Sequence, residues 1–194
     1  MTITAVGCTL GGSKLSPENI LDYAGNREAA VYDCYRDCLY SADKVTGSFA
    51  FRTTGSEVAG MGDTDRLGLG RFTSTNSRPV EELAAYFVTG DGGTLRIMVL
   101  SAAYKDESSA QVTFKQYAAK LKANYKTGAE VKSGLWHDLR IITIVPEDKS
   151  QFSAVGVYQE DRYLMIMIET DPTGYCAAFN GISDDLELPD LYVK

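Results

Sequence analysis

The sequence predicts a single α+β domain built on a mainly antiparallel sheet, with its helices packed on one face and a two-helix arm at the N-terminus. Strand-like apolar segments separated by short turns dominate the second half of the chain, and strands joined by short turns pair antiparallel. One long segment among them has helical periodicity instead. The 194 residues, 44% of them hydrophobic, are enough to form one buried core.

The N-terminal arm is predicted to contain two helices. Ser16 can cap the first helix, Pro17 suits its first position, and Gly25 is expected to end it. The second helix is expected over residues 26–44, where apolar side chains recur at the spacing of one buried helical face: Ala30, Val31, Cys34, Tyr35, Cys38, Leu39 and Ala42.

The middle of the chain is predicted to be rich in strands. Residues 47–54 alternate Phe with small or polar residues, as a half-buried strand does. Residues 55–78 contain many Gly residues and are expected to form a loop or an irregular hairpin. Residues 84–89 and 95–103 are two apolar segments on either side of the Asp91-Gly92-Gly93 turn signal, which predicts a hairpin.

The second half is expected to open with the clearest helix of the chain, over residues 107–126. Lys115, Lys120, Lys122 and Lys126 lie on the other faces of this helix. Three strands are expected next, over residues 139–145, 152–158 and 162–169. A short last helix is expected to begin at Asp171-Pro172 and to stop at Asn180-Gly181.

The apolar stripe of the 107–126 helix predicts how the core is assembled. Its large members are Phe114, Tyr117, Leu121 and Tyr125. We expect them to pack on the sheet beside Ile97, Val99, Ile142, Ile144, Leu164 and Ile166.

The charge balance limits the classes of partner. Acidic residues outnumber basic ones by 26 to 19, which gives a net charge of -7. Phosphate backbones and anionic lipid headgroups are repelled on average by such a surface, so nucleic acid is not an expected partner. No apolar run approaches the roughly 20 residues that cross a bilayer.

The first residues end in Ala5-Val6-Gly7-Cys8, small or apolar residues followed by Cys, and a short polar tract comes next. This pattern resembles the lipid-attachment site of bacterial lipoproteins, with Ala5 where Leu is usual. The resemblance implies a diacylglyceryl group on Cys8, an extracytoplasmic location and membrane contact only through the lipid. Residues 1–15 are then a signal remnant and a flexible tether, and residues 16–194 are one domain.

Only seven residues precede Cys8, fewer than the charged region and apolar segment of a signal sequence require. We therefore expect Met1 to lie inside a longer original signal. The alternative is that residues 2–7 form an edge strand with a buried Cys8. The order of elements in the body loosely resembles that of uncharacterised lipoproteins of Gram-positive bacteria and of the PsbP and Mog1-like sandwich. Fold resemblance alone does not assign a function.

Metal and cofactor motifs are absent from the sequence. His137 is the single His, so no site built on paired histidines is predicted. The Gly-rich stretch at residues 60–70 fits neither a dinucleotide-binding nor a phosphate-binding pattern. Asp63 and Asp65 imitate the start of a calcium loop, but Ser74 stands where a bidentate Glu is required. No cofactor and no metal are expected.

The remaining thiols leave several interpretations open. Cys34, Cys38 or Cys176 could meet His137 in a thiol enzyme, although a buried Cys is usually inert. If Cys8 is lipidated, the other three cysteines allow one disulfide and one free thiol. An intracellular protein keeps all of them reduced.

Three function hypotheses follow from these features. The favoured one is a non-enzymatic, lipid-anchored binding domain for a protein or small-molecule ligand. The second is a hydrolase-type enzyme that uses carboxylates predicted to lie in loops, namely Asp63, Asp65, Asp91 and Glu160. The third is a cytosolic or phage-encoded structural protein. The sequence assigns no catalytic residue and no oligomeric state.

Overall fold

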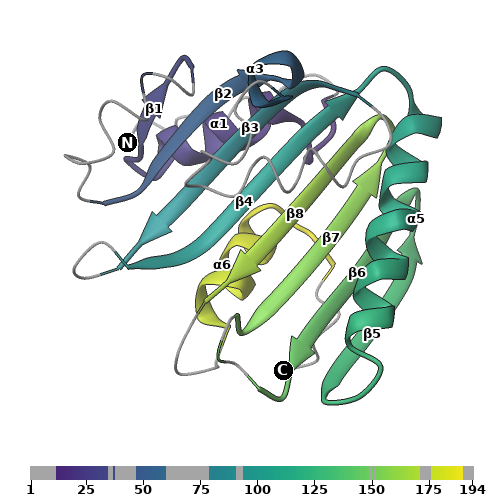
Figure 1. The fold of residues 1–194 in the computed structure, drawn as a ribbon. Coiled ribbons are helices and arrows are strands. Elements are labelled where there is room, and N and C mark those ends of the chain that lie inside the picture. Colours follow the sequence, from purple (N-terminus) through teal and green to yellow (C-terminus); the bar gives the residue numbers. More distant parts are fainter. Residues whose placement is uncertain are drawn as a thin grey trace, which may run out of the picture.

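The protein is an α+β fold centred on one eight-stranded sheet, which confirms the predicted fold class. The computed structural model describes residues 12–34, 37, 47–59, 79–90, 94–148, 150, 152–170 and 176–189. The strands are arranged in the order β1-β2-β3-β4-β8-β7-β6-β5, as Figure 1 shows. All pairs are antiparallel except β1 with β2.

The elements have the following bounds. The strands are β1 Ala30–Tyr32, β2 Phe49–Thr54, β3 Val80–Thr89, β4 Leu95–Tyr104, β5 Ala129–Trp136, β6 Leu139–Pro146, β7 Ala154–Glu160 and β8 Tyr163–Glu169. The helices are α1 Pro17–Asn26, α3 Gly55–Ala59, α5 Glu107–Asn124 and α6 Ala177–Asp185. The five strands predicted within residues 84–103 and 139–169 therefore belong to one sheet and pair antiparallel, as expected.

α5 connects the β3–β4 hairpin to the other half of the sheet, which consists of β5, β6, β7 and β8. β3 and β4 form a hairpin, and α5 then carries the chain from β4, in the middle of the sheet, to β5 at its edge. From β5 the chain returns strand by strand through β6 and β7 to β8, which pairs with β4. The sheet thus ends on one side at β5, with α5 running along that side in Figure 1.

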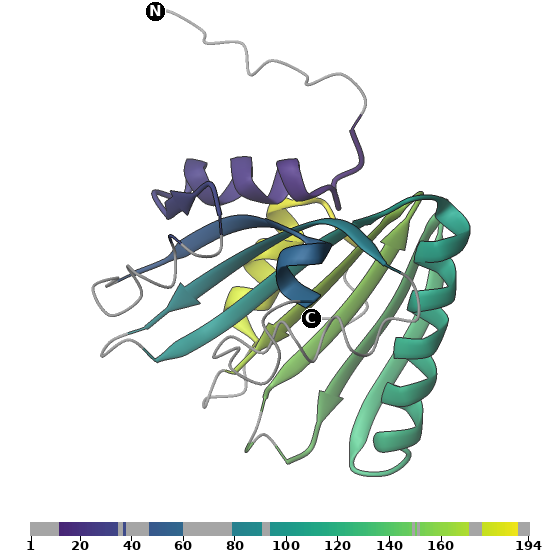
Figure 2. The same ribbon diagram turned by 45° about the horizontal axis from the view of Figure 1, so that its top comes forward.

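Helices cover both faces of the sheet, so the prediction that they share one face was wrong. α5 packs on one face, and α1 and α6 pack on the other (Figure 2). The reason lies in the strands themselves. Along β7 nearly every residue is buried, whichever face it points to. A strand that is apolar on both faces needs cover on both, unlike a strand that alternates apolar and polar residues.

The face under α5 contains the aromatic part of the core. Phe49 and Phe87 stack there with ring centroids 4.9 Å apart. The predicted helix residues Phe114, Tyr117, Leu121 and Tyr125 lie on this face with Ile142, Ile144, Leu164 and Ile166, as expected. Ile97 and Val99 do not, because alternate residues of a strand point to opposite faces and these two point toward α1 and α6.

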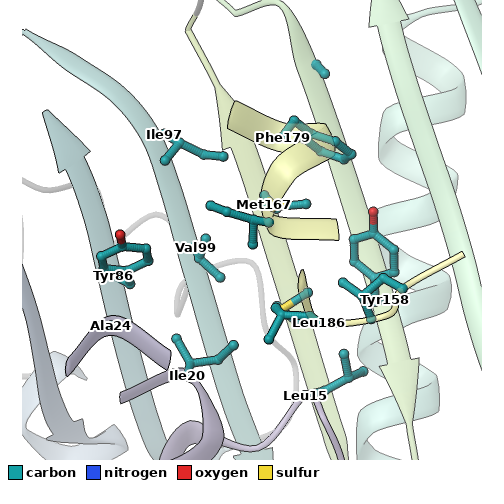
Figure 3. Packing of buried hydrophobic residues seen from close by; sticks show 14 of the residues in the cluster. Leu15, Ile20, Ala24, Tyr86, Ile97, Val99, Tyr158, Met167, Phe179 and Leu186 are labelled. Atoms are coloured by element: carbon teal, nitrogen blue, oxygen red, sulfur yellow. The ribbon is translucent and has the colours of Figure 1, made fainter. Parts of the chain in front are cut away.

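The face under α1 and α6 contains the second part of the core. Figure 3 shows Ile20 of α1 near Val99 of β4, with Ile97 farther along the same strand and Phe179 of α6 over the neighbouring strands. Tyr23 of α1 joins the two helices, because its hydroxyl donates to the Asp185 carboxylate at 2.9 Å. Residues from both ends of the described chain therefore complete one layer.

The first predicted helix of the N-terminal arm is α1, and within the range of the second, 26–44, the structure describes a helical residue at Asp37. α1 begins as expected, with the Ser16 hydroxyl accepting from the backbone N–H of Asn19 at 3.2 Å. The prediction of a second helix was wrong for residues 30–32, because they form the strand β1, which pairs with β2. Glu28, with a φ of 59°, turns the chain out of the helix before β1 starts. Residues 38–46 lie outside the described part.

The last helix begins and ends later than predicted, since Cys176 precedes its first residue as a non-helical N-cap. α6 continues through Asn180-Gly181 to Asp185, because Phe179, Ile182 and Leu186 all pack into the core. Tertiary packing here outweighs the tendency of Gly to end helices. The predicted cap, Asp171-Pro172, lies outside the described residues.

The packed body begins before Ser16. Leu15 is fully buried, and its carbonyl accepts from the Ser101 hydroxyl. Ser13 donates its hydroxyl to Glu160 at 2.6 Å. Lys14 forms an ion pair with Glu187 and holds the pKa of that carboxyl below its usual value. A flexible tether can therefore consist only of residues before Ser13.

Candidate interaction surface

The edge strand β5 is the feature that sequence reasoning missed. Residues 129–136 were not predicted as a strand, because Lys132, Ser133 and Gly134 interrupt the apolar pattern. In the structure they pair with β6 over the full length, from Ala129 opposite Pro146 to Trp136 opposite Leu139. Trp136 is therefore the last residue of β5, directly before the turn to β6.

His137 and Asp138 form the two-residue turn between β5 and β6. His137 has a φ of 50°, the positive value that the favoured two-residue hairpin turns require at their first central position. Its ring meets the Trp136 ring edge-on, with centroids 5.6 Å apart. The turn therefore orders the only Trp and the only His of the chain side by side at the sheet edge.

Two large apolar side chains beside this turn are exposed. Leu135 is 67% exposed and Trp136 is 60% exposed, more than any other large hydrophobic residue in the described part of the chain. Neighbours in a strand point to opposite faces, so these side chains flank the edge on both sides. Adjacent exposed apolar residues of this size indicate an interaction site more strongly than scattered ones do.

The backbone of β5 is open along its outer edge. No described strand pairs with it on that side. In an antiparallel ladder, every second residue of an edge strand directs its N–H and C=O groups away from its partner. On the strand itself, Lys132 and Glu130 form an ion pair at 2.8 Å.

A row of lysines on α5 runs beside this edge. Lys115 and Lys122 are exposed and seven residues apart, the spacing of one helix side, and exposed Lys126 follows the C-cap of the helix. Lys122 identifies that side, because its ammonium lies 3.5 Å from the hydroxyl of Ser133 in β5. None of the three forms an ion pair with the residues that the structure describes. The sequence had shown these lysines on the helix surface without showing what they adjoin.

Arg140 of β6 holds the start of α5 against the β5–β6 hairpin. Its guanidinium lies 3.7 Å from the Glu107 carboxylate in the first turn of α5. It also donates to the Gln159 side chain of β7 at 2.6 Å. Helix, edge hairpin and neighbouring strand are therefore linked by one side chain, which fixes the lysine row relative to β5.

The described cysteines do not meet His137. Cys34 follows β1, at the opposite edge of the sheet from β5. Cys176 lies beside Ser153, whose carbonyl accepts from its thiol at 3.8 Å, just before the start of β7. The β5–β6 turn lies near the other end of β7, since Arg140 pairs with Gln159. The thiol-enzyme hypothesis is therefore wrong for Cys34 and Cys176.

Other predicted cysteine roles reach beyond the described residues. Cys8, the expected lipid-attachment site, and Cys38 both lie outside them. Cys34 has a free thiol in this structure, and Cys176 is buried. The α6 backbone beside Cys176 is capped by a buried carboxylate, because Glu169 accepts from the N–H groups of Ala178 at 3.2 Å and Phe179 at 2.8 Å.

The loop carboxylates do not form a described cluster. Asp63, Asp65 and Asp91 lie outside the described residues. The Glu160 carboxylate accepts a hydrogen bond from the Ser13 hydroxyl. Within the described residues, no group of three or more His, Cys, Asp or Glu side chains could hold a metal ion. Within the same part of the chain, no helix is both long and apolar enough to cross a membrane.

Neither a protein-family model nor a curated protein sequence matches this chain.

Proposed function

We propose that this protein is a non-enzymatic binding domain, held outside the cytoplasm by a lipid on Cys8, and that it binds its partner through the edge of β5. The single observation that carries the binding role is the pair of exposed side chains Leu135 and Trp136 at the end of an open edge strand. The anchor is supported by the sequence around Cys8.

The energetic reason for a binding role is the cost of this surface in water. Burying apolar area is worth about 25 cal/mol per Å², so leaving a Leu and a Trp exposed forgoes stability that a core position would provide. Trp is also the residue type most enriched among the few that dominate binding energy at interfaces. A partner that covers both side chains would recover this free energy.

Cross-linking in cells tests the proposed surface. The chain is expressed behind a complete lipoprotein signal that ends at Cys8, with a photo-reactive amino acid at position 136 or, as the control, at exposed Glu18 on α1. We expect a discrete adduct from position 136, weakened by Leu135→Ser, and none from position 18. Equal adducts from both positions, or none, would show that this edge is not the binding surface.

Fatty-acid labelling of the same cells tests the anchor separately. We expect the label on the protein and its loss in Cys8→Ser. A labelled Cys8→Ser protein, or an unlabelled parent, would overturn the lipid anchor and the location that rests on it.

A further inference from the structure

We infer that the open edge of β5 takes up an extended acidic segment of a protein partner, which pairs with it as a ninth strand. This inference rests on the proposed binding function and names the chemistry of its partner. Strand addition is a common way for a sheet edge to bind a peptide, because main-chain hydrogen bonds supply affinity and side-chain contacts supply specificity.

The backbone of β5 has the geometry for this pairing. The two-residue turn makes Trp136 and Leu139 the closing pair of the hairpin. The alternation of an antiparallel ladder then turns the N–H and C=O groups of Ser133 and Leu135 away from β6. An added strand can bond to these groups without disturbing the existing sheet.

The charge beside the edge selects an acidic segment. Lys115 and Lys122 share one side of α5, Lys126 follows the end of that helix, and the ammonium of Lys122 reaches Ser133 of β5. The protein as a whole has a net charge of -7, so this row is a local exception to its surface. Carboxylates that alternate along an added strand would face the lysines every second residue.

The apolar side chains add contacts on both faces of the added strand. Ser133 and Leu135 are two residues apart and therefore share the face toward α5. Trp136 points to the opposite face, where its partner Leu139 lies in the core under α1 and α6. A ninth strand would thus meet Leu135 and the lysines on one face and Trp136 on the other.

Two other occupants fit the same edge less well. A second copy that paired antiparallel through β5 would keep both α5 helices on one face and set two rows of lysines against each other. An anionic membrane would meet Asp138 in the β5–β6 turn and Asp161 in the adjacent β7–β8 turn, and like charges repel. Both occupants remain outcomes of the test.

The test uses the full chain and a defined probe. The probe is a fluorescent, end-capped decapeptide of alternating Glu and Val. Its controls are the same peptide with Pro in place of two central Val residues, and a decapeptide of alternating Lys and Val. Trp136 is the only Trp, so its emission reports coverage of the edge directly. We expect saturable, salt-sensitive binding of the acidic peptide alone, with a blue shift of the emission.

Matched variants separate the lysine row from general charge. Lys122→Glu places a negative charge beside β5, whereas Lys120→Glu makes the same change on the other side of the same helix. We expect Lys122→Glu to weaken binding about tenfold or more, and Lys120→Glu to leave the affinity within about twofold.

A backbone variant tests the ladder itself. Ser133→Pro removes an outward N–H that only an added strand needs, because Pro is tolerated on edge strands at such positions. We expect it to abolish binding, with Ser133→Ala unaffected. Hydrogen exchange of the parent protein gives the same information without a variant, since the amide of Ser133 should exchange more slowly with peptide bound.

Several results would overturn the inference. Equal affinity for the Pro-containing peptide would show attraction by charge without strand pairing, and equal losses in the two Lys variants would remove the lysine row from the site.

A Trp136 blue shift with vesicles of phosphatidylcholine and phosphatidylglycerol, but not with peptide, would assign the edge to a membrane. Dimers dispersed by Ser133→Pro in sedimentation would assign it to a second copy. If cross-linking from position 136 persists in Lys122→Glu and Ser133→Pro, the binding surface stands and only strand addition fails.

Discussion

Individual residues explain how closely α6 approaches the sheet. Gly156 lies in β7, where the ring of Tyr158 and the ring of Phe179 from α6 both cross the strand. A Cβ at Gly156 would come within 2.7 Å of Tyr158 Cε2 and 2.8 Å of Phe179 Cζ. Both rings belong to fully packed core residues, so neither can move away freely.

Gly156→Ala should therefore destabilise the protein by roughly 1–3 kcal/mol through overpacking. Gly134→Ala is the matched control, because nothing lies within 4 Å of a Cβ at that position in β5. Urea unfolding of the two variants measures the difference. If both behave like the parent protein, the rings over Gly156 are free to shift.

The buried carboxylate of Glu169 has a comparable role at the start of α6. Each of its two oxygens accepts from a different backbone N–H, those of Ala178 and Phe179. Glu169→Gln preserves the volume of the side chain but turns one oxygen into an N–H donor that faces another donor. We expect a loss of about 1.5–3 kcal/mol in the free energy of unfolding, because a buried donor is left unsatisfied. A loss below about 0.5 kcal/mol, typical of surface changes, would contradict this role.

Helix caps could be predicted from the sequence only where the capping residue lies next to the helix it caps. Ser16 caps a helix that starts at the next residue, and both the cap and the start were predicted correctly. Glu169 caps α6 from the end of β8, several positions upstream of the first helical residue. Nothing in the sequence marks such a cap, since it depends on where the sheet places the carboxylate.

Among the elements, α5 shows a gradient of burial that its periodic sequence conceals. Phe114, in the first half of the helix, is buried, whereas Leu121 and Tyr125 in the second half are only partly buried. The second half lies beside β5, at the edge of the sheet, so solvent reaches its flank. Regular spacing predicts which side of a helix faces the core but not how deeply each turn is buried.

Truncation of two residues on α5 should reveal this gradient. We expect Phe114→Ala to cost about 3–5 kcal/mol, as full truncations in cores do. Leu121→Ala should cost only about 1–2 kcal/mol, because part of its side chain already contacts water. Chemical denaturation measures both values. An equal or larger loss for Leu121→Ala would mean that the second half of α5 is buried as deeply as the first.

Prediction of the strands succeeded or failed according to their place in the sheet. β6, β7 and β8 are central, and their nearly continuous apolar sequences identify them. β1 and β5 are the two edges, where solvent removes the need for an apolar pattern. The candidate site therefore lay where the sequence signal is weakest: the lysines of the helix were identified, but neither β5 nor its position beside them could be inferred.

At the scale of the whole molecule, tyrosines are part of the packed layers on both faces of the sheet: partly buried Tyr23 and buried Tyr86 on one face, and buried Tyr104 on the other. Tyr23 links α1 to Asp185 of α6, and burial followed by that hydrogen bond raises its pKa. Tyr86 packs edge-on against Tyr23, and its pKa is also raised by burial. Tyr104, on the other face, is fully buried, and the Thr113 hydroxyl offsets only part of the rise in its pKa.

These shifts predict a loss of stability at alkaline pH. A tyrosine in the unfolded chain releases its proton near pH 10, whereas each of these three holds its proton to higher pH in the folded protein. The stabilisation is complete below about pH 10 and is lost progressively above it, because the unfolded state then binds fewer protons. The free energy of unfolding should therefore fall progressively as the pH rises above about 10. Tyr104→Phe should reduce the size of this fall, since its phenol no longer ionises on unfolding. Urea unfolding across this pH range, for the parent and for Tyr104→Phe, measures both effects. An identical fall in the two proteins would show that folding does not raise the pKa of Tyr104.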